Sequence, residues 1–128
     1  MAPAPRVGLA DISLRSLSSL SVPGVAPIAA LAPALRALDR VGLCSLDPWG
    51  DMTFEHALGV LQESPWERLR RVAVHVTHTP LRLTLRGRCL LGFRPHEWNV
   101  IEAFVRQAVD CGVTSFLVYE PLNDLTAL

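Results

Sequence analysis

The sequence predicts an α/β fold in which short parallel strands alternate with helices. Short apolar runs bounded by glycine or proline recur along the chain, and longer stretches with apolar residues three and four positions apart separate them. A strand, a helix and a second strand in succession imply a crossover connection and parallel pairing. The chain has 128 residues, of which 50% are hydrophobic, so it can build one core. We therefore expect one domain over residues 1–128, with residues 1–6 as a disordered tail.

The first strand is expected over residues 7–13, where apolar residues alternate with small or polar ones. A serine-rich turn leads into an Ala/Leu-rich helix over residues 25–40. Pro33 lies inside that pattern, so it should kink the helix or begin its main part, because proline lacks an N–H donor. Gly42 is the expected terminator of the helix, and residues 43–46 form the second strand.

Two helices are expected from the stretch SLDPWGDMTFEHALGVLQESPWERLRR, residues 45–71, and they carry the chain on to residue 75. Thr53 is the predicted N-terminal cap of the first helix. Ser64 is the predicted cap of the second, with a proline at the first helical position and a glutamate three residues after the cap. Trp49 and Trp66 lie beside these turns, and we interpret them as packing anchors rather than as a ligand cage.

The last third of the chain predicts a strand, a helix and a fourth strand. Residues 80–86 alternate apolar and polar side chains and end at Gly87. A helix is expected over residues 95–111, ended by Gly112, and a strand over residues 115–119. The apolar face of the helix comprises Trp98, Ile101, Phe104, Val105 and Ala108.

Composition excludes several classes of function. Twelve basic residues balance twelve acidic ones, so no net field attracts nucleic acid or an anionic membrane. No apolar run approaches the roughly 18 residues that a membrane helix needs. The three cysteines form no Cys-x-x-Cys pair, which argues against a disulfide framework or a zinc knuckle and favours a reducing, cytoplasmic location.

Neither the cysteines nor the histidines form a convincing metal site. Cys44 lies on a predicted buried strand and should be an inert apolar group. His75 and His78 are three residues apart, but the Thr79-Pro80 pair ends the helix there.

Four ordered blocks of sequence resemble the metal-dependent carboxyltransferase domain of biotin enzymes, such as pyruvate carboxylase, oxaloacetate decarboxylase and transcarboxylase. The blocks are SLDPWGDMTF, ESPWERLRR, TPLRLTLRG followed by LLGFRP, and YEPLND. The resemblance covers residues 11–125. It implies the eight-stranded (β/α)8 barrel and places this chain on the first four βα units, half of a TIM barrel.

The resemblance also implies a chemistry that this sequence lacks the residues to perform. The family holds a divalent metal with an aspartate, two histidines and a carboxylated lysine, and the metal polarises a keto acid while carboxybiotin carries carbon dioxide. The family aspartate follows an arginine after the first strand, whereas here Arg15 precedes Ser16. Ser18 and Ser19 replace a family histidine and glutamine, and the other metal ligands come from later strands. We therefore expect no catalytic residue, no metal and no cofactor.

The implied barrel has its site at the carboxyl ends of its strands. Arg15, Asp47, Arg86 and Glu120 follow the four predicted strands. The resemblance implies Arg15 and Arg86 as the candidate substrate-binding residues, and an arginine fork can bind a carboxylate. The plainer interpretation, which we favour, is that Arg86 pairs with a neighbouring acid, Asp47 or Glu120.

An open half of a barrel is expected to associate with another chain. It has two unpaired edges and, as we interpret the strands, an apolar inner face. Each large apolar side chain left exposed to water costs about 1.5–3 kcal/mol relative to its burial, against a total stability of roughly 5–15 kcal/mol. We expect self-association as a homodimer or larger assembly, or binding to a complementary chain.

These observations predict a non-catalytic pseudoenzyme that acts as a structural, scaffold or regulatory protein. The alternative is a working subunit of a biotin-dependent carboxyltransferase or oxaloacetate decarboxylase, acting on pyruvate or oxaloacetate with its site completed by another chain. A small-ligand binding module that uses Arg86 is a third possibility. A partner chain can supply a lysine and histidines but cannot restore an aspartate at Ser16.

Overall fold

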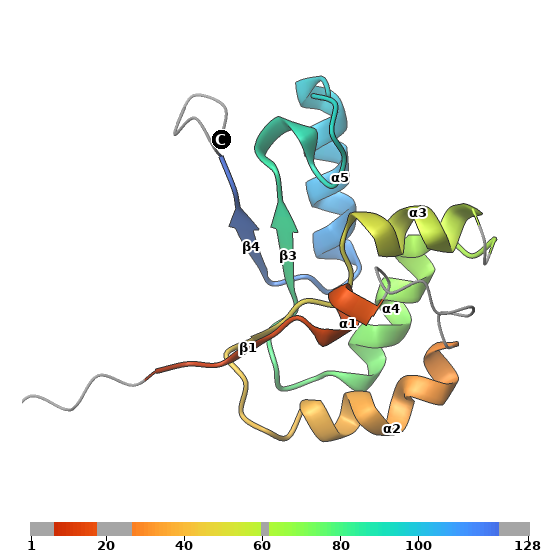
Figure 1. Ribbon diagram of the computed structural model, residues 1–128, viewed down its shortest axis with the longest axis vertical. Coiled ribbons are helices and arrows are strands. Elements are labelled where there is room, and N and C mark those ends of the chain that lie inside the picture. Colours follow the sequence, from red (N-terminus) through yellow and green to blue (C-terminus); the bar gives the residue numbers. More distant parts are fainter. Residues whose placement is uncertain (1–6, 18–26, 60–61, 121–128) are drawn as a thin grey trace, which may run out of the picture.

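The computed structural model describes residues 7–17, 27–59 and 62–120, in which helices gather on one side of short parallel strands (Figure 1). The elements in order are β1 (Ala10–Asp11), α1 (Ser13–Leu17), α2 (Ile28–Leu38), β2 (Ser45–Leu46), α3 (Asp51–Gly59), α4 (Pro65–His75), β3 (Arg82–Leu85), the 3-10 turn η1 (Gly87–Cys89), α5 (Trp98–Asp110) and β4 (Ser115–Val118). The predicted α/β class with parallel strands is confirmed.

The strands follow the order β1-β2-β3-β4, but the seams between them are unequal. The β3 and β4 strands pair over four residues, and β1 and β2 pair over two. The β2 and β3 strands share one bridge, Leu46 with Leu81, where the Leu46 N–H donates to the Pro80 carbonyl at 2.9 Å. The central seam therefore has the fewest backbone hydrogen bonds in the described sheet.

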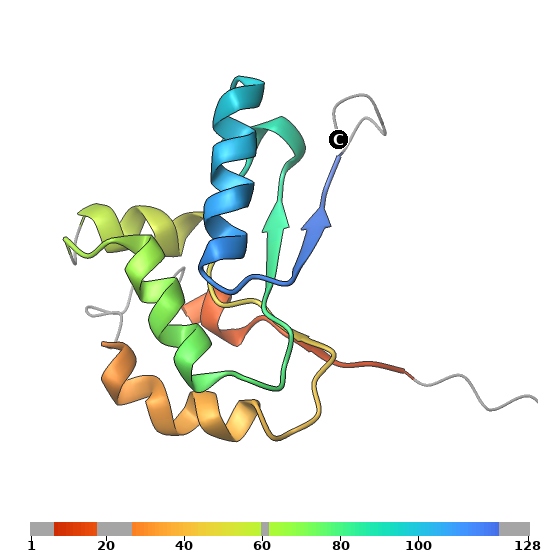
Figure 2. The same cartoon turned by 180° about the vertical axis from the view of Figure 1, so that it is seen from behind.

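The hydrophobic core lies between the strands and the helices, whose arrangement Figure 1 and Figure 2 show from opposite sides. Leu46 and Leu83 supply it from β2 and β3, and both are 0% exposed. Leu35 of α2 and Leu69 of α4 are buried as deeply, from the helix side. The predicted apolar face of α5 packs against this core through Ile101, Phe104, Val105 and Ala108, whereas Trp98 at its start is half exposed.

Four aromatic rings join the loop after β2 to three helices. Trp49 stacks on Phe54 with ring centroids 5.0 Å apart, and Trp66 meets both rings edge-on. Phe104 of α5 completes the group at 5.1 Å from Trp66. Trp49 is 3% exposed, so the prediction that the tryptophans are packing anchors is confirmed.

One of the two predicted helix caps is present. The Ser64 hydroxyl accepts from the Glu67 N–H at 3.5 Å and α4 begins at Pro65, as predicted. The Thr53 cap is wrong, because α3 begins two residues earlier, at Asp51. The Thr53 hydroxyl instead accepts from the Gly50 N–H at 3.4 Å, so it satisfies the residue before the helix from within the first turn.

The first strand is shorter than predicted. Residues 7–13 were expected to form it, but β1 covers Ala10–Asp11 and Ser13 already belongs to α1. The Asp11 carboxylate accepts from both the N–H and the hydroxyl of Ser13 at 3.0 Å, and this local bonding turns the chain out of the sheet. The predicted tail over residues 1–6 lies outside the described residues.

The remaining elements match their predictions apart from one burial assignment. The bounds of α2, α4, α5, β3 and β4 fall inside the predicted ranges, and Pro33 lies within α2. Gly112 has φ +103 just after α5, as a helix-ending glycine should. Cys44 is exposed, not buried as predicted, because it precedes β2 and lies beside the exposed N-terminal part of the first strand.

Asp39 ties the end of α2 to the loop after α4. Its carboxylate accepts from the N–H groups of Thr77, His78 and Thr79 at 3.0, 2.9 and 2.7 Å. The His78 Nδ1 atom lies 2.8 Å from Oδ2 of the same carboxylate. Burial raises the pKa of Asp39, but the hydrogen bonds from the His78 side chain and the three backbone groups outweigh it and hold the pKa well below its usual range.

The Asp39→Asn variant should unfold more easily by about 2–4 kcal/mol at neutral pH, because charged hydrogen bonds are lost. A carboxyl whose pKa is lower in the folded state stabilises fully above its unfolded pKa of about 3.9, and this contribution is lost as the pH falls below that value. Urea unfolding at pH 6 and pH 3 should therefore show a smaller pH effect in the variant. Equal pH effects in wild type and variant would contradict this account, and Asp110→Asn at an exposed position is the control.

Candidate functional site

Asp47 lies at the carboxyl end of β2 and joins three elements through a buried carboxylate. The residue is 0% exposed. Its Oδ1 accepts from Arg82 Nε at 2.8 Å, and its Oδ2 accepts from the Thr84 hydroxyl at 2.9 Å. Arg15 of α1 brings a guanidinium nitrogen to 4.0 Å from Oδ2. We refer to Asp47, Arg15, Arg82 and Thr84 as the Asp47 cluster.

The alternation of β3 places the polar members of this cluster on the inner face of the sheet, the face turned away from the helices. Leu83 and Leu85 are buried against the helices, so Arg82 and Thr84 project from the opposite side. The inner face of β3 is therefore polar. The prediction of an apolar inner face is therefore wrong for β3, whose leucines face the helices. On β4, the apolar Leu117 lies opposite Thr84 and shares the inner face.

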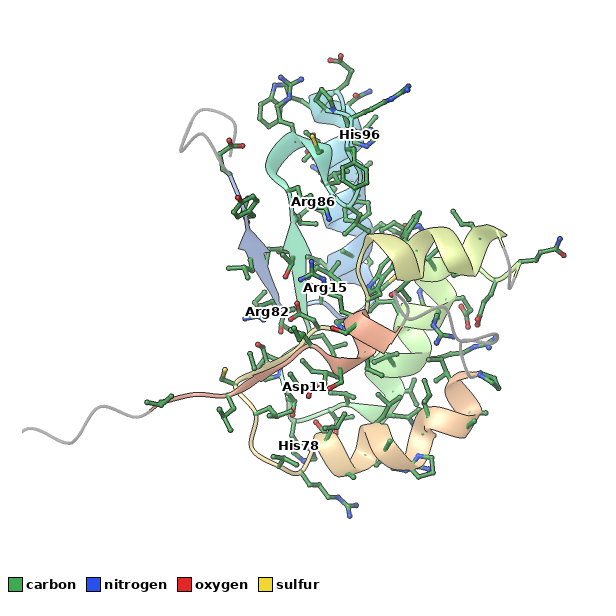
Figure 3. The ribbon with its side chains drawn as sticks, viewed as in Figure 1. Asp11, Arg15, His78, Arg82, Arg86 and His96 are labelled. Carbon is green, nitrogen blue, oxygen red and sulfur yellow. The ribbon has the colours of Figure 1, made fainter. Side chains whose placement is uncertain are left out.

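A hollow of about 310 Å³ opens beside the Asp47 cluster. It brings together the two predicted substrate-binding residues, Arg15 and Arg86, which lie near each other in front of β3 in Figure 3. The Arg86 guanidinium lies over the Phe93 ring at 4.7 Å. The full lining comprises Arg15, Thr84, Arg86, Leu117, Val118 and Tyr119.

Of the two acids predicted as partners of Arg86, Asp47 is held instead by Arg82 and Thr84. The second acid, Glu120, lies beside Gly87, where an added Cβ atom would be 2.6 Å from Glu120 Oε2. Gly87 has φ +49, a backbone conformation that favours glycine. The pairing of Arg86 with Glu120 stays a prediction, as does the polar cluster of Asp47 and Glu120 at the strand ends.

Sequence reasoning missed Arg82 and Thr84. The signal for them was present, because Arg82, Thr84 and Arg86 alternate with leucines and must share one face of a strand. Gly50 was also overlooked. A Cβ atom there would lie 2.9 Å from Arg15 Cγ, so this glycine lets the arginine pass across the loop toward Asp47.

The described residues offer no group of three or more His, Cys, Asp or Glu side chains able to hold a metal ion. His75 and His78 have separate contacts, with Arg36 at 3.4 Å and with Asp39. Ser16 lies in α1 next to Arg15, whereas Ser18 and Ser19 fall outside the described residues. Among the described helices, none is both long and apolar enough to cross a membrane.

Comparison with known proteins finds relatives among carboxylases, although no family-wide sequence profile matches. The chain is 37% identical over 95 residues to a pyruvate carboxylase subunit of Methanothermobacter thermautotrophicus, covering 74% of this chain and 17% of the relative. It is 30% identical over 118 residues to the methylmalonyl-CoA carboxyltransferase 5S subunit of Propionibacterium freudenreichii, covering 92% of this chain and 23% of that subunit.

Solved structures give the same answer. The carboxyl transferase domain from Rhizobium etli pyruvate carboxylase with pyruvate and biocytin matches at a TM-score of 0.80 and 31% identity, over 95% of this chain and 21% of that one. The strands and helices described above therefore follow the arrangement of a barrel-type carboxyltransferase domain. The chain belongs to the carboxyltransferase-domain family of pyruvate carboxylases and corresponds to part of that domain. It spans about a sixth of the length of the first relative.

The Asp47–Arg82 pair should be strongly coupled, because its carboxylate is removed from water. The single variants Asp47→Asn and Arg82→Met should each lower the free energy of unfolding by about 3–5 kcal/mol. The double variant should lose less than their sum by about 1–3 kcal/mol. Urea unfolding of all four proteins gives the coupling energy.

The same cycle at Glu102 and Arg106, an exposed pair on α5, is the matched control. It should give a coupling of at most about 0.5 kcal/mol. Equal coupling energies in the two cycles would contradict a special role for the buried pair.

Proposed function

We propose that this chain is a non-catalytic relative of carboxyltransferase domains that acts by binding, as a structural, scaffold or regulatory protein. The observation that carries the proposal is Ser16, which follows Arg15 where the family has a metal-binding aspartate. A serine hydroxyl is a poor ligand for a hard divalent cation, which prefers carboxylate oxygens. Without that metal, enolate charge on a keto acid has no Lewis acid to stabilise it.

The Asp47 cluster supports this proposal. In it, the Asp47 carboxylate is satisfied by Arg82 and Thr84 of the same chain, with Arg15 nearby. A buried carboxylate that is paired within its own chain needs no ligand to offset its loss of hydration. The polar inner face therefore has a structural explanation that requires no chemistry.

We further propose that the chain forms four strands of a (β/α)8-type barrel and associates with another polypeptide to complete it. Leu117, Val118 and Tyr119 support this, because they are 48%, 43% and 62% exposed on and just after β4. Leu117 and Tyr119 alternate onto one face of the strand and Val118 onto the other, so both faces leave apolar surface exposed, as at an interaction site.

A second candidate function is favoured by one observation. Arg15 and Arg86 line the same hollow, so a keto-acid carboxylate can approach two guanidinium groups there. The chain would then be a working subunit that acts on pyruvate or oxaloacetate, with a partner supplying metal ligands. The first relative is named as a pyruvate carboxylase subunit, which supports pyruvate as the substrate of such a subunit.

Metal content and turnover separate the two candidates. The purified chain, loaded with Mn²⁺ and desalted, should retain well below one metal per chain by elemental analysis. Oxaloacetate consumption should not depend on Mn²⁺. The variants Arg86→Met and Arg88→Met should behave like the wild type.

Cation-dependent turnover that Arg86→Met abolishes and Arg88→Met leaves intact would overturn the non-catalytic proposal. Arg88 is the matched control because it lies two residues away and lines a different cavity from the Arg86 hollow.

A further inference from the structure

The β4 strand presents an open edge on the outside of the sheet (Figures 1 and 2). Its odd-numbered residues form backbone hydrogen bonds with the β3 side. The Ser115 N–H donates to the Leu81 carbonyl at 3.2 Å, and the Tyr119 N–H donates to the Leu85 carbonyl at 2.7 Å. In a parallel pair, alternate residues of a strand bond to a given neighbour. The backbone groups of Phe116 and Val118 therefore point away from β3, and no strand in the described chain pairs with them.

The β1 strand presents the opposite open edge of the same sheet. The Leu9 and Asp11 carbonyls accept from the N–H groups of Cys44 and Asp47 at 2.8 and 2.9 Å. By the same alternation, the backbone groups of Gly8 and Ala10 point away from β2. Each edge thus offers two residues, spaced two apart, with backbone donors and acceptors that the described sheet leaves unpaired.

Charge and proline, two of the features that protect natural edge strands, are absent from residues 7–10 and 115–119. Residues 115–119, SFLVY, contain no charge and no proline. On the other edge, Val7 and Leu9 are 90% and 67% exposed. The one acid in β1, Asp11, is engaged with Ser13. Both edges are therefore suited to strand pairing.

The two edges also match in side-chain placement. Val118 lies opposite Leu85, so it is on the helix side of the sheet. Leu9 is two residues from Asp11, which lies opposite Leu46, so it is on the same side. Beside Val118 is an apolar cavity of about 220 Å³ that Phe116 and the α5 residues Trp98, Ile101 and Val105 also line. A leucine arriving next to Val118 has apolar surface to cover.

We propose that the partner is a second copy of this chain, whose β1 edge pairs in parallel with the β4 edge of the first. The inference rests on the proposed function, since it names the partner of a chain that acts by association. Repeating the contact in the other direction, β1 of the first copy with β4 of the second, closes a two-fold dimer with no open edge.

Sedimentation velocity of the full chain from 1 to 100 μM tests the proposal. The wild type should form a dimer. The variants Leu9→Glu and Val118→Lys, one on each edge, should each raise the dissociation constant by about tenfold or more, since each loses apolar burial. Val74→Lys is the control, because Val74 is 71% exposed on α4, and it should dimerise like the wild type.

An equimolar mixture of Leu9→Glu and Val118→Lys should form mixed dimers more tightly than either variant alone. In the mixed dimer one contact is unaltered and the other places opposite charges across the strands. Circular dichroism confirms that both variants are folded. A monomeric wild type, or weakening by Val118→Lys without any effect of Leu9→Glu, would overturn the proposal.

This outcome is separate from the test for catalysis. An inactive monomer refutes the dimer and leaves the non-catalytic proposal standing. A dimer with metal-dependent activity supports the dimer and refutes the non-catalytic proposal.

Discussion

The structure depends on the Asp47 carboxylate, because it reinforces the weakest seam of the sheet. Between β2 and β3 the backbone contributes one bridge, at Leu46 and Leu81. The Asp47 side chain crosses the same seam twice, to Arg82 and to Thr84. Side-chain bonds thus replace the ladder that a longer strand would form. Because hydrogen bonds to a buried charge are stronger than neutral ones, two of them can substitute for several backbone bonds.

This constraint explains both the polarity of the inner face and the position of a glycine. Burying a carboxylate is unfavourable unless cations and donors surround it, and β3 supplies them on the face that its leucines leave free. Arg15 comes from α1 and crosses Gly50, where any side chain would collide with it. The residues that line the hollow are therefore first of all parts of the fold. Under the non-catalytic proposal, this framework is retained for its interaction surface.

The sequence predicted the parts of the fold that local pattern determines. The alternation of residues 80–86 and the Ser64-Pro65 start of α4 located β3 and α4 within a few residues. The Thr53 assignment failed because a side chain can satisfy the helix start from inside it as well as from before it. The Asp47–Arg82 bond joins residues 35 positions apart, and nothing in local pattern selects Arg82 over Arg86 as the partner. Local pattern also cannot predict which face of a strand points inward, because that depends on where the helices pack.

Hydrogen exchange at the Leu46 amide tests the central role of Asp47 most directly, since this N–H donates to the Pro80 carbonyl across the seam at 2.9 Å. In wild type the amide should be protected to a degree comparable with amides in the middle of α5, such as Phe104. In Asp47→Asn the Leu46 amide should exchange at least about tenfold faster, an opening free energy lower by at least about 1.4 kcal/mol, and its protection should fall by a larger factor than that of the Phe104 amide. Equal protection of Leu46 in the two proteins would show that the seam holds without the carboxylate and would contradict the account.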